Sequence, residues 1–268
     1  MRPAVAFAVG AVAGVIAVRE RRARRAAERF AAASLETLLN AIDANDAQTG
    51  AHVRRVATYA LVLSEAAGLS QRECLNVERV ALFHDIGKIH EALFDIIHDP
   101  TTLTPADRRA IATHPRRGAT VLAPLCGFYP ELADGVLSHH ERWDGTGYPR
   151  RLRGARIPLA ARVVTIADTL DAITHGRRYR DARGAQHAAN AIAAERGRQF
   201  DPDLVDLVLQ PPVWERVVDA HREAHRRQRR QPERREGQRE SPIPQVTFRW
   251  RREAPESHEQ PRSSHTHP

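Results

Sequence analysis

Apolar residues recur at helical spacing through most of the chain, from about residue 27 to residue 210. Leu38 and Ile42, for example, lie four residues apart and would share one face of a helix. Ser70 followed by Glu73 forms a capping box, which is a typical start of a helix. The alternating pattern of strands is scarce, and no internal repeat is visible. The pattern therefore predicts an all-α fold.

The two ends of the chain depart from this pattern. Residues 3–18 form an uncharged apolar run, and Arg19 follows with four further arginines up to Arg25. The run is slightly shorter than the roughly 20 residues of a typical membrane span, and the basic residues behind it favour the cytoplasmic side. We therefore expect one N-terminal anchor with the remaining chain inside the cell. Residues 213–268 are rich in arginine and are expected to form a mostly disordered tail, with one helix over 213–224.

Composition narrows the classes of function. The net charge is +8, but the excess of arginine lies before residue 30 and after residue 212, so the middle of the chain is nearly neutral. A domain that binds nucleic acid carries its basic face on the domain itself, so nucleic acid is not expected as a partner. Cys74 and Cys126 are too few for a disulfide framework or a thiolate zinc site.

Several histidines and aspartates stand in apolar helical segments, where their burial is costly unless they are engaged. Each has an ordinary interpretation by itself, as a surface residue or a hydrogen-bonded core residue. A metal site would satisfy all of them together. Imidazoles and carboxylates without thiolates suit Fe, Mn, Ni or Zn. The candidates are His52, His84, Asp85, His114, His139, His140, Asp168 and Asp171.

The order of these residues resembles the HD-GYP subfamily of the HD superfamily of metal-dependent phosphohydrolases. The resemblance covers roughly residues 36–208. It rests on His84-Asp85-Ile86-Gly87-Lys88, on His114-Pro115 with Gly118, on HHERWDGTGYP at 139–149, and on Ile157-Pro158, Asp168, Asp171-Ala172 and Arg177. It implies an HD-type helical bundle with a metal site in its core. It also implies hydrolysis of the bacterial second messenger cyclic di-GMP.

The resemblance implies a role for each matching residue. The metal ligands would be His52, His84, Asp85, His114, His139, His140 and Asp168. Asp85 would bridge two divalent ions, most simply Fe or Mn, with Ni and Zn also compatible. Such a pair activates a water and stabilises the attacking and leaving oxygens of a phosphodiester. The ammonium of Lys88 would neutralise a phosphate oxygen in the transition state. The substrate contacts would be Lys88, Gly147, Tyr148, Arg177 and Arg180.

Three positions depart from the pattern of the family. Gln48 stands one turn before His52, where members with a third metal carry a glutamate, so we expect a binuclear site. The segment 90–92 reads His-Glu-Ala where Gly-Ile-Pro is usual, which bears on substrate access. Arg177-Arg178-Tyr179 replaces the usual Arg-Pro-Tyr.

These observations predict an anchor with its basic flank over residues 1–26, a catalytic domain over 27–212 and a tail over 213–268. The leading interpretation is a cyclic di-GMP phosphodiesterase at the cytoplasmic face of a bacterial inner membrane, or in the cytoplasm if residues 3–18 do not insert. The alternatives are a catalytically idle sensor or interaction module and a hydrolase of another phosphate ester. Signalling partners at the loop 145–149 and a homodimer stay open.

Overall fold

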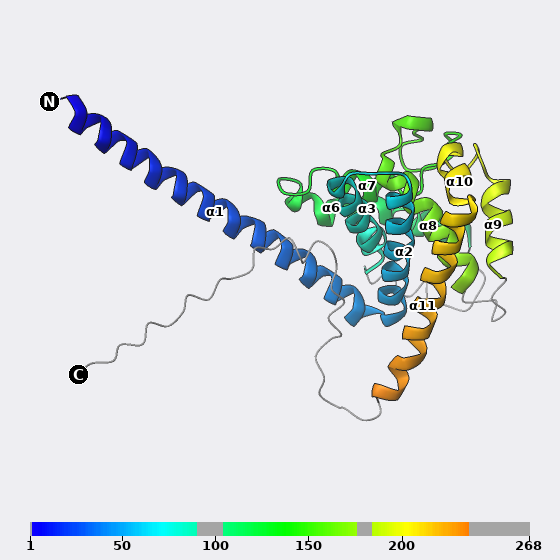
Figure 1. The fold of residues 1–268 in the computed structure, drawn as a ribbon. Coiled ribbons are helices and arrows are strands. Elements are labelled where there is room, and N and C mark those ends of the chain that lie inside the picture. The colour runs from blue at the N-terminus through cyan, green and yellow to red at the C-terminus, as the bar shows by residue number, and fades with distance from the viewer. Residues whose placement is uncertain (1, 90–103, 176–183, 236–268) are drawn as a thin grey trace. The chain divides into compact units, whose positions relative to one another are not determined.

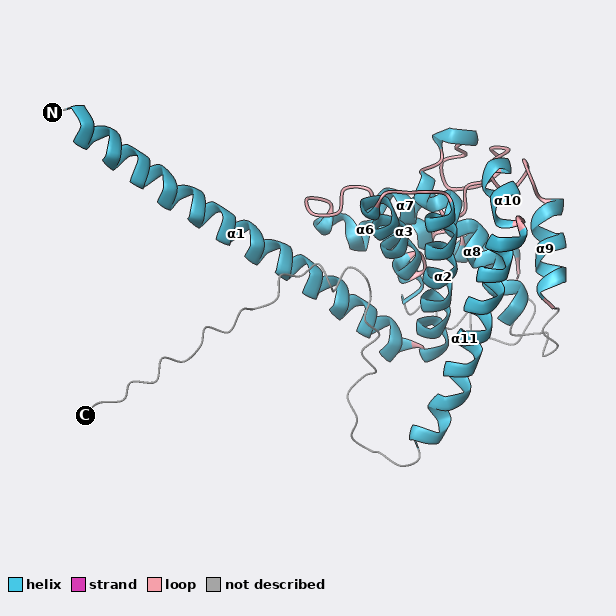
Figure 2. Ribbon diagram, viewed as in Figure 1, coloured by secondary structure: helices cyan, strands magenta, loops and turns pink. Residues whose placement is uncertain are grey.

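The computed structural model describes residues 2–89, 104–175 and 184–235 (Figure 1). Helices form the regular structure of these residues, and the described part contains one isolated β-bridge, between Arg196 and Phe200, but no strand (Figure 2). The predicted all-α fold is therefore confirmed. The elements are α1 Arg2–Asn45, α2 Ala47–Ala66, α3 Gln71–Phe83, η1 Ile86–Ile89, α5 Pro105–Ile111, α6 His114–Leu122, η2 Ala123–Leu125, α7 Leu132–Ser138, η3 Gly154–Arg156, α8 Leu159–His175, α9 Ala185–Ala194, α10 Pro202–Val208 and α11 Pro211–Arg235.

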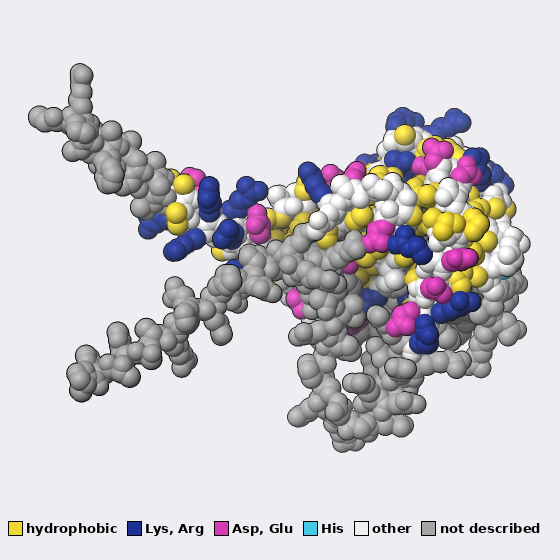
Figure 3. Space-filling view, in the orientation of Figure 1, with side chains coloured by type: hydrophobic (Ala, Val, Ile, Leu, Met, Phe, Trp, Pro, Cys, Tyr) yellow, Lys and Arg dark blue, Asp and Glu magenta, His cyan; other side chains and the backbone are white. Residues whose placement is uncertain are grey.

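The chain divides into two compact units, of which Leu35–Ser241 is the larger. Its core is formed where α2, α3 and α8 pack against one another. The predicted capping box at Ser70 and Glu73 is present and starts α3. On the face of this unit seen in Figure 3, acidic side chains lie among the basic ones of the described residues.

The other unit contains residues 1–34, which are helical from Arg2 onward as the first part of α1. The apolar run 3–18 lies here, but the side chains of residues 2–15 are outside the described part. Among the described residues, no helix combines the length and the apolar character that a membrane crossing requires. The anchor predicted for residues 3–18 stays a prediction.

The last described helix, α11, is longer than the helix expected over 213–224. It begins at Pro211 and ends at Arg235, it packs against α2, and Val213 and Val217 are buried. The first part of the segment expected to be a tail is therefore a packed helix, because an apolar pair at i and i+4 faces the bundle. Residues 236–268 lie outside the described part. The boundaries at residues 26 and 212 stay predictions.

Gly87 allows η1 to lie directly against α6. A Cβ atom at this position would overlap the carbonyl oxygen of His114 and would lie 2.7 Å from the backbone nitrogen of Gly118. The close approach is possible only because residue 87 has no side chain. It holds η1, and Asp85 just before it, beside the first turn of α6.

We expect Gly87→Ala to destabilise the fold, because the atoms in the way are backbone atoms that cannot turn aside. The free energy of unfolding should fall by about 1–3 kcal/mol, as for other overpacked sites, measured by urea denaturation. Gly127→Ala is the matched control, because nothing lies within 4 Å of a Cβ atom there. Equal stability of the two variants would contradict this account of the η1–α6 contact.

Candidate metal centre

Seven side chains converge in the larger unit, Leu35–Ser241. They are His52 on α2, His84 and Asp85 directly after α3, His114 at the start of α6, His139 and His140 directly after α7, and Asp168 on α8. The rings of His52 and His139 flank that of His84, with centroids 5.3 and 5.1 Å away. The structure therefore brings together all the residues that were predicted as metal ligands.

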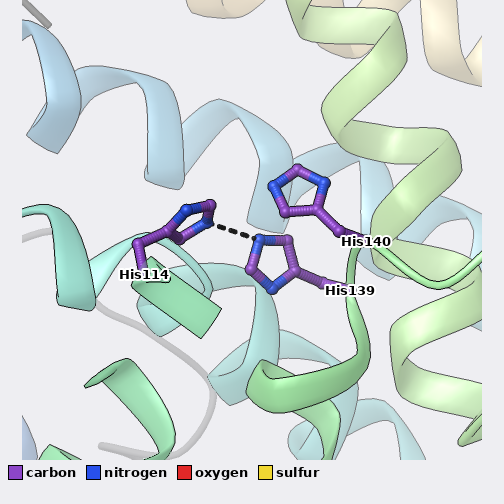
Figure 4. Close-up of side chains that lie close together, drawn as sticks. All are labelled: His114, His139 and His140. Atoms are coloured by element: carbon purple, nitrogen blue, oxygen red, sulfur yellow. Dashed lines mark hydrogen bonds between the residues drawn. The ribbon is translucent and has the colours of Figure 1, made fainter. Parts of the chain in front are cut away.

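The ligand atoms form two groups, in each of which they lie within 4.8 Å of one another. One group is His114, His139 and His140 (Figure 4), and the other is His52, His84 and Asp85. Asp168 extends the second group, since its Oδ1 lies 3.3 Å from Nε2 of His52 and 3.9 Å from Nε2 of His84.

Asp85 lies between the two groups. Its Oδ1 is 3.4 Å from Nε2 of His114, and its Oδ2 is 3.5 Å from Nε2 of His84. One carboxylate thus presents an oxygen to each group. This is the placement that a bridging ligand of two cations requires.

Backbone carbonyls fix the tautomer of three of the histidines. Each places its Nδ1 within hydrogen-bond distance of a carbonyl oxygen three residues earlier: His84 to Ala81 at 2.8 Å, His114 to Ile111 at 2.8 Å, and His139 to Val136 at 2.6 Å. A carbonyl only accepts, so Nδ1 must carry a proton, and in the neutral form of the ring Nε2 keeps its lone pair. The three Nε2 atoms are therefore acceptors that point into the site, the arrangement of metal-binding histidines.

These acceptors lack partners within the described part of the chain. Nε2 of His84 and Oδ1 of Asp85 are buried and accept no hydrogen bond from the described residues. Nε2 of His114 and Nε2 of His139 face one another at 3.1 Å (Figure 4), although both are acceptors. Buried polar atoms without partners are costly, and cations would satisfy them. The donor set of imidazoles and carboxylates fits divalent Fe, Mn, Ni or Zn.

His52 is held in a different way, by a buried carboxylate. Its Nδ1 lies 2.7 Å from Oδ2 of Asp171, and Arg55 donates to both oxygens of Asp171 at 2.7 and 2.9 Å. Asp171 thus orients the ring so that Nε2 faces Asp85 and Asp168. Asp171 was predicted as a candidate but not as a ligand, and Arg55 was not among the candidates. The available signal was the spacing, because each lies three residues after a predicted ligand.

Burial and neighbouring charges set the protonation states. Burial lowers the pKa of His114 to about 3 and that of His140 to about 2, so both rings are neutral at pH 7. Burial also lowers the pKa of His52, but hydrogen bonds to Asp168 and Asp171 outweigh it and raise the pKa to about 10. Burial raises the pKa of Asp85, but the surrounding positively charged groups, Lys88 foremost, together outweigh burial and hold that pKa well below its usual range.

We expect metal binding to release a proton from His52. A metal ion must displace the proton that His52 carries below pH 10, so about one proton per chain should leave at pH 7, and the apparent affinity should rise about tenfold per pH unit up to that pKa. Calorimetry in buffers of different ionisation enthalpy measures the proton count. Asp171→Asn should lower the pH up to which the affinity rises, since one of the hydrogen bonds that raise the pKa of His52 is weakened. Binding without proton release in the wild type would contradict the assignment of His52.

Lys88 reaches the edge of the site from η1. Its Nζ donates to Oδ2 of Asp85 at 2.7 Å, and its side chain is 29% exposed. The ammonium is thus directed at the centre and remains accessible to a ligand.

The loop after α7 lies against the centre. The ring of Tyr148 stacks on that of His140, with centroids 5.0 Å apart. Burial raises the pKa of Tyr148 to about 12, so its hydroxyl stays protonated. Both carboxylate oxygens of Glu141 accept backbone hydrogen bonds, from Arg150 at 2.6 Å and Leu152 at 2.9 Å. Glu141, to which the sequence motif assigned no role, therefore holds the loop in place.

The other predicted substrate contacts differ in how far the structure describes them. Gly147 lies in the same loop, and a Cβ atom there would come within 2.6 Å of the carbonyl oxygen of His140, so only glycine fits. Arg177, Arg180 and the segment 90–92 lie outside the described residues. Their roles, and that of Gln48 in limiting the site to two metals, stay predictions.

Comparison with known proteins gives one family. Residues 36–204 match the family model described as HD domain. The chain is 36% identical over 175 residues to the 3'3'-cGAMP-specific phosphodiesterase 2 of Vibrio cholerae, covering 65% of this chain and 33% of that protein. It is 37% identical over 179 residues to the cyclic di-GMP phosphodiesterase response regulator RpfG of Xanthomonas campestris, covering 66% and 47%. This chain spans half or less of the length of these two relatives.

A further relative and a solved structure are also similar to this chain. The cyclic di-GMP phosphodiesterase of Thermotoga maritima is 31% identical over 200 residues, covering 73% of this chain and 52% of that protein. The crystal structure of the HD domain of L. monocytogenes phosphodiesterase PgpH, in complex with cyclic di-AMP, is similar with a TM-score of 0.51 at 19% identity. That match covers 68% of this chain and 94% of the other. The structural likeness shows the fold.

Proposed function

Because the chain belongs to the HD domain family and carries the HD-GYP motifs, we propose that it is a metal-dependent phosphodiesterase that hydrolyses cyclic di-GMP. The observation that carries the proposal is the position of Asp85, whose two oxygens face two groups of imidazoles. Two bound divalent ions would supply an activated water and would stabilise the attacking and leaving oxygens.

The residues of the chain have distinct tasks in this proposal. His84, His114 and His139 offer lone pairs because their Nδ1 protons are engaged by carbonyl oxygens. The carboxylate of Asp85 carries its negative charge at neutral pH and bridges the two groups. Lys88 binds a phosphate oxygen of the substrate and stabilises the charge that develops on it. Tyr148 presents its ring and a protonated hydroxyl beside His140 for contact with the dinucleotide.

The names of the relatives support a cyclic dinucleotide as substrate and leave two candidates. Of the three relatives described above, two are named for cyclic di-GMP and one for 3'3'-cGAMP. We propose cyclic di-GMP because the full GYP loop is present at 147–149. The metal ions are proposed to be Fe or Mn, which metal analysis of the purified protein would identify.

The decisive experiment is turnover of cyclic di-GMP by the full chain loaded with Fe(II) or Mn(II) under anaerobic conditions. Products are separated by chromatography, with 3'3'-cGAMP as a second substrate and His84→Ala/Asp85→Ala as the control. Metal-dependent product that is lost in the control supports the proposal. Faster turnover of 3'3'-cGAMP would mean that 3'3'-cGAMP, and not cyclic di-GMP, is the substrate. Bound metal without product from either would favour a sensor, and the absence of bound metal would refute the ligand assignment.

We propose in addition that residues 3–18 attach the protein to the cytoplasmic face of the inner membrane. The support is the uncharged apolar run followed by arginines. In fractionated bacterial cells, the full chain should sediment with the membranes, and a chain without residues 1–26 should remain in the supernatant. The same distribution for both chains would refute the anchor. Signalling partners at 145–149 and a homodimer stay predictions.

A further inference from the structure

Polar residues form a ladder between α2 and α8 that leads away from the candidate metal centre. Both helices carry polar residues at i, i+3 and i+7, which is the spacing of a single helical face. The residues are His52, Arg55 and Tyr59 on α2 and Asp168, Asp171 and His175 on α8. The two helices pack against one another along this face. The ladder therefore connects predicted metal ligands to groups further along the bundle.

The contacts within the ladder are continuous. Nε2 of His52 lies 3.3 Å from Asp168, and Nδ1 of the same ring lies 2.7 Å from Asp171. Oδ1 of Asp171 lies 3.1 Å from Nδ1 of His175, whose side chain is 11% exposed. Asp171 is thus held from both sides, by Arg55 on α2 and by His175 on its own helix.

A residue of α11 closes the far end of the ladder. The ring of His221 meets that of His175 edge to face, with centroids 4.8 Å apart. Its Nδ1 lies 3.2 Å from the hydroxyl of Tyr59, which is buried. His221 therefore contacts the last residue of the ladder on each of the two helices.

α11 lies beyond residues 36–204, which match the family model. It docks on α2 through buried Val213 and Val217 and through an ion pair of 2.6 Å between Arg216 and Glu65. These contacts do not account for a histidine placed between Tyr59 and His175.

We propose that His221 is a positioning residue for the metal centre. Its ring keeps His175 turned toward Asp171, and Asp171 in turn holds the ring of His52 with Nε2 directed at Asp85 and Asp168. Supporting partners of this kind tune the affinity of a metal site, and networks of buried hydrogen bonds respond as a unit. The inference rests on the proposed function in that it takes His52 as a metal ligand.

The test is the affinity of the full chain for Mn(II), measured without any nucleotide by competition with a chromophoric chelator. His221→Ala should raise the Kd for Mn(II) about tenfold, the lower end of the range for supporting residues. Arg216→Ala is the matched control, because it removes a docking contact of the same helix without touching the ladder. It should change the Kd less than about twofold, since exposed ion pairs contribute little.

A second variant separates positioning from general loosening of the helix. His221→Phe keeps a ring against His175 and should retain most of the affinity, to within about threefold of the wild type. The visible spectrum of the Co(II)-loaded protein should change in His221→Ala and remain unchanged in Arg216→Ala. Equal Kd values for His221→Ala and Arg216→Ala would overturn the proposal, as would a loss in His221→Phe as large as that in His221→Ala.

The role of His221 and the proposed function can be refuted by different results. A wild type that binds Mn(II) tightly and does not hydrolyse cyclic di-GMP would refute the proposed function, while the comparison of His221→Ala with Arg216→Ala would still decide the role of His221. A wild type that binds no Mn(II) would overturn the role of His221 together with the ligand assignment.

Discussion

Asp85→Asn is expected to abolish the proposed hydrolysis of cyclic di-GMP. The substitution keeps the shape of the side chain and removes the charge that faces both groups of imidazoles. A neutral amide cannot bridge two cations, and so both the metal content and the rate should fall. We expect the rate to fall at least about 100-fold. The loss of a residue that only supports a ligand already costs up to about 100-fold, and Asp85 is predicted to be a ligand itself.

Turnover and metal content per chain, the latter by elemental analysis, measure this effect together. Asp219→Asn is the matched control, because it makes the same chemical change on the exposed face of α11. The control should retain the metal content and rate of the wild type. Asp85→Asn protein that still bound two metals and turned over within tenfold of the wild type would show that Asp85 is not the bridge.

Lys88→Ala is expected to lower kcat while the metals stay bound. The ammonium is 29% exposed and lies at the edge of the centre, where it can reach a phosphate oxygen of the substrate. Loss of one group that stabilises developing charge typically costs about 100- to 1000-fold in kcat. Steady-state kinetics and metal analysis at pH 8 would measure both quantities.

Lys88→Arg separates charge from geometry, because it keeps the positive charge but replaces a compact ammonium by a planar fork. It should recover part of the lost rate. The alternative is that Lys88 acts through Asp85, to which it donates a hydrogen bond at 2.7 Å. In that case, activity and metal content would fall in parallel in Lys88→Ala, and the catalytic role would be wrong.

The local features of the fold could be predicted from the sequence because they depend on neighbouring residues. The capping box of Ser70 and Glu73 needs only the spacing of three residues. The helical spacing of apolar residues also involves only neighbouring positions, and so it predicts helices. The length of α11 could not be predicted, because a segment rich in arginine has few apolar residues. Among its described side chains, Val213 and Val217 show that one face is buried.

The ligands of the candidate site could be predicted from the sequence, but the residues that hold these ligands in place could not. The predicted ligands stand in recognisable strings such as His84-Asp85 and His139-His140, and the resemblance assigned them. The pairing of Arg55 with Asp171 joins residues 116 positions apart. The contact of Tyr59 with His221 spans 162 positions. Helical spacing predicts which residues share a face but not which face of another helix it meets, so such pairs emerge only from the packing.

Two helices end at the metal centre, and this has a consequence for the order in which ligands bind. His84 is the C-cap of α3 and His139 is the C-cap of α7. The C-terminal end of a helix carries a partial negative charge from its macrodipole, up to about half an elementary charge, which favours cations and opposes anions. A cyclic dinucleotide brings two negative phosphates toward these ends. Divalent ions reverse the sign of the local potential, so we expect the metals to bind first and the dinucleotide second. The supply of metal in the cell would then decide whether the protein can respond to its nucleotide at all.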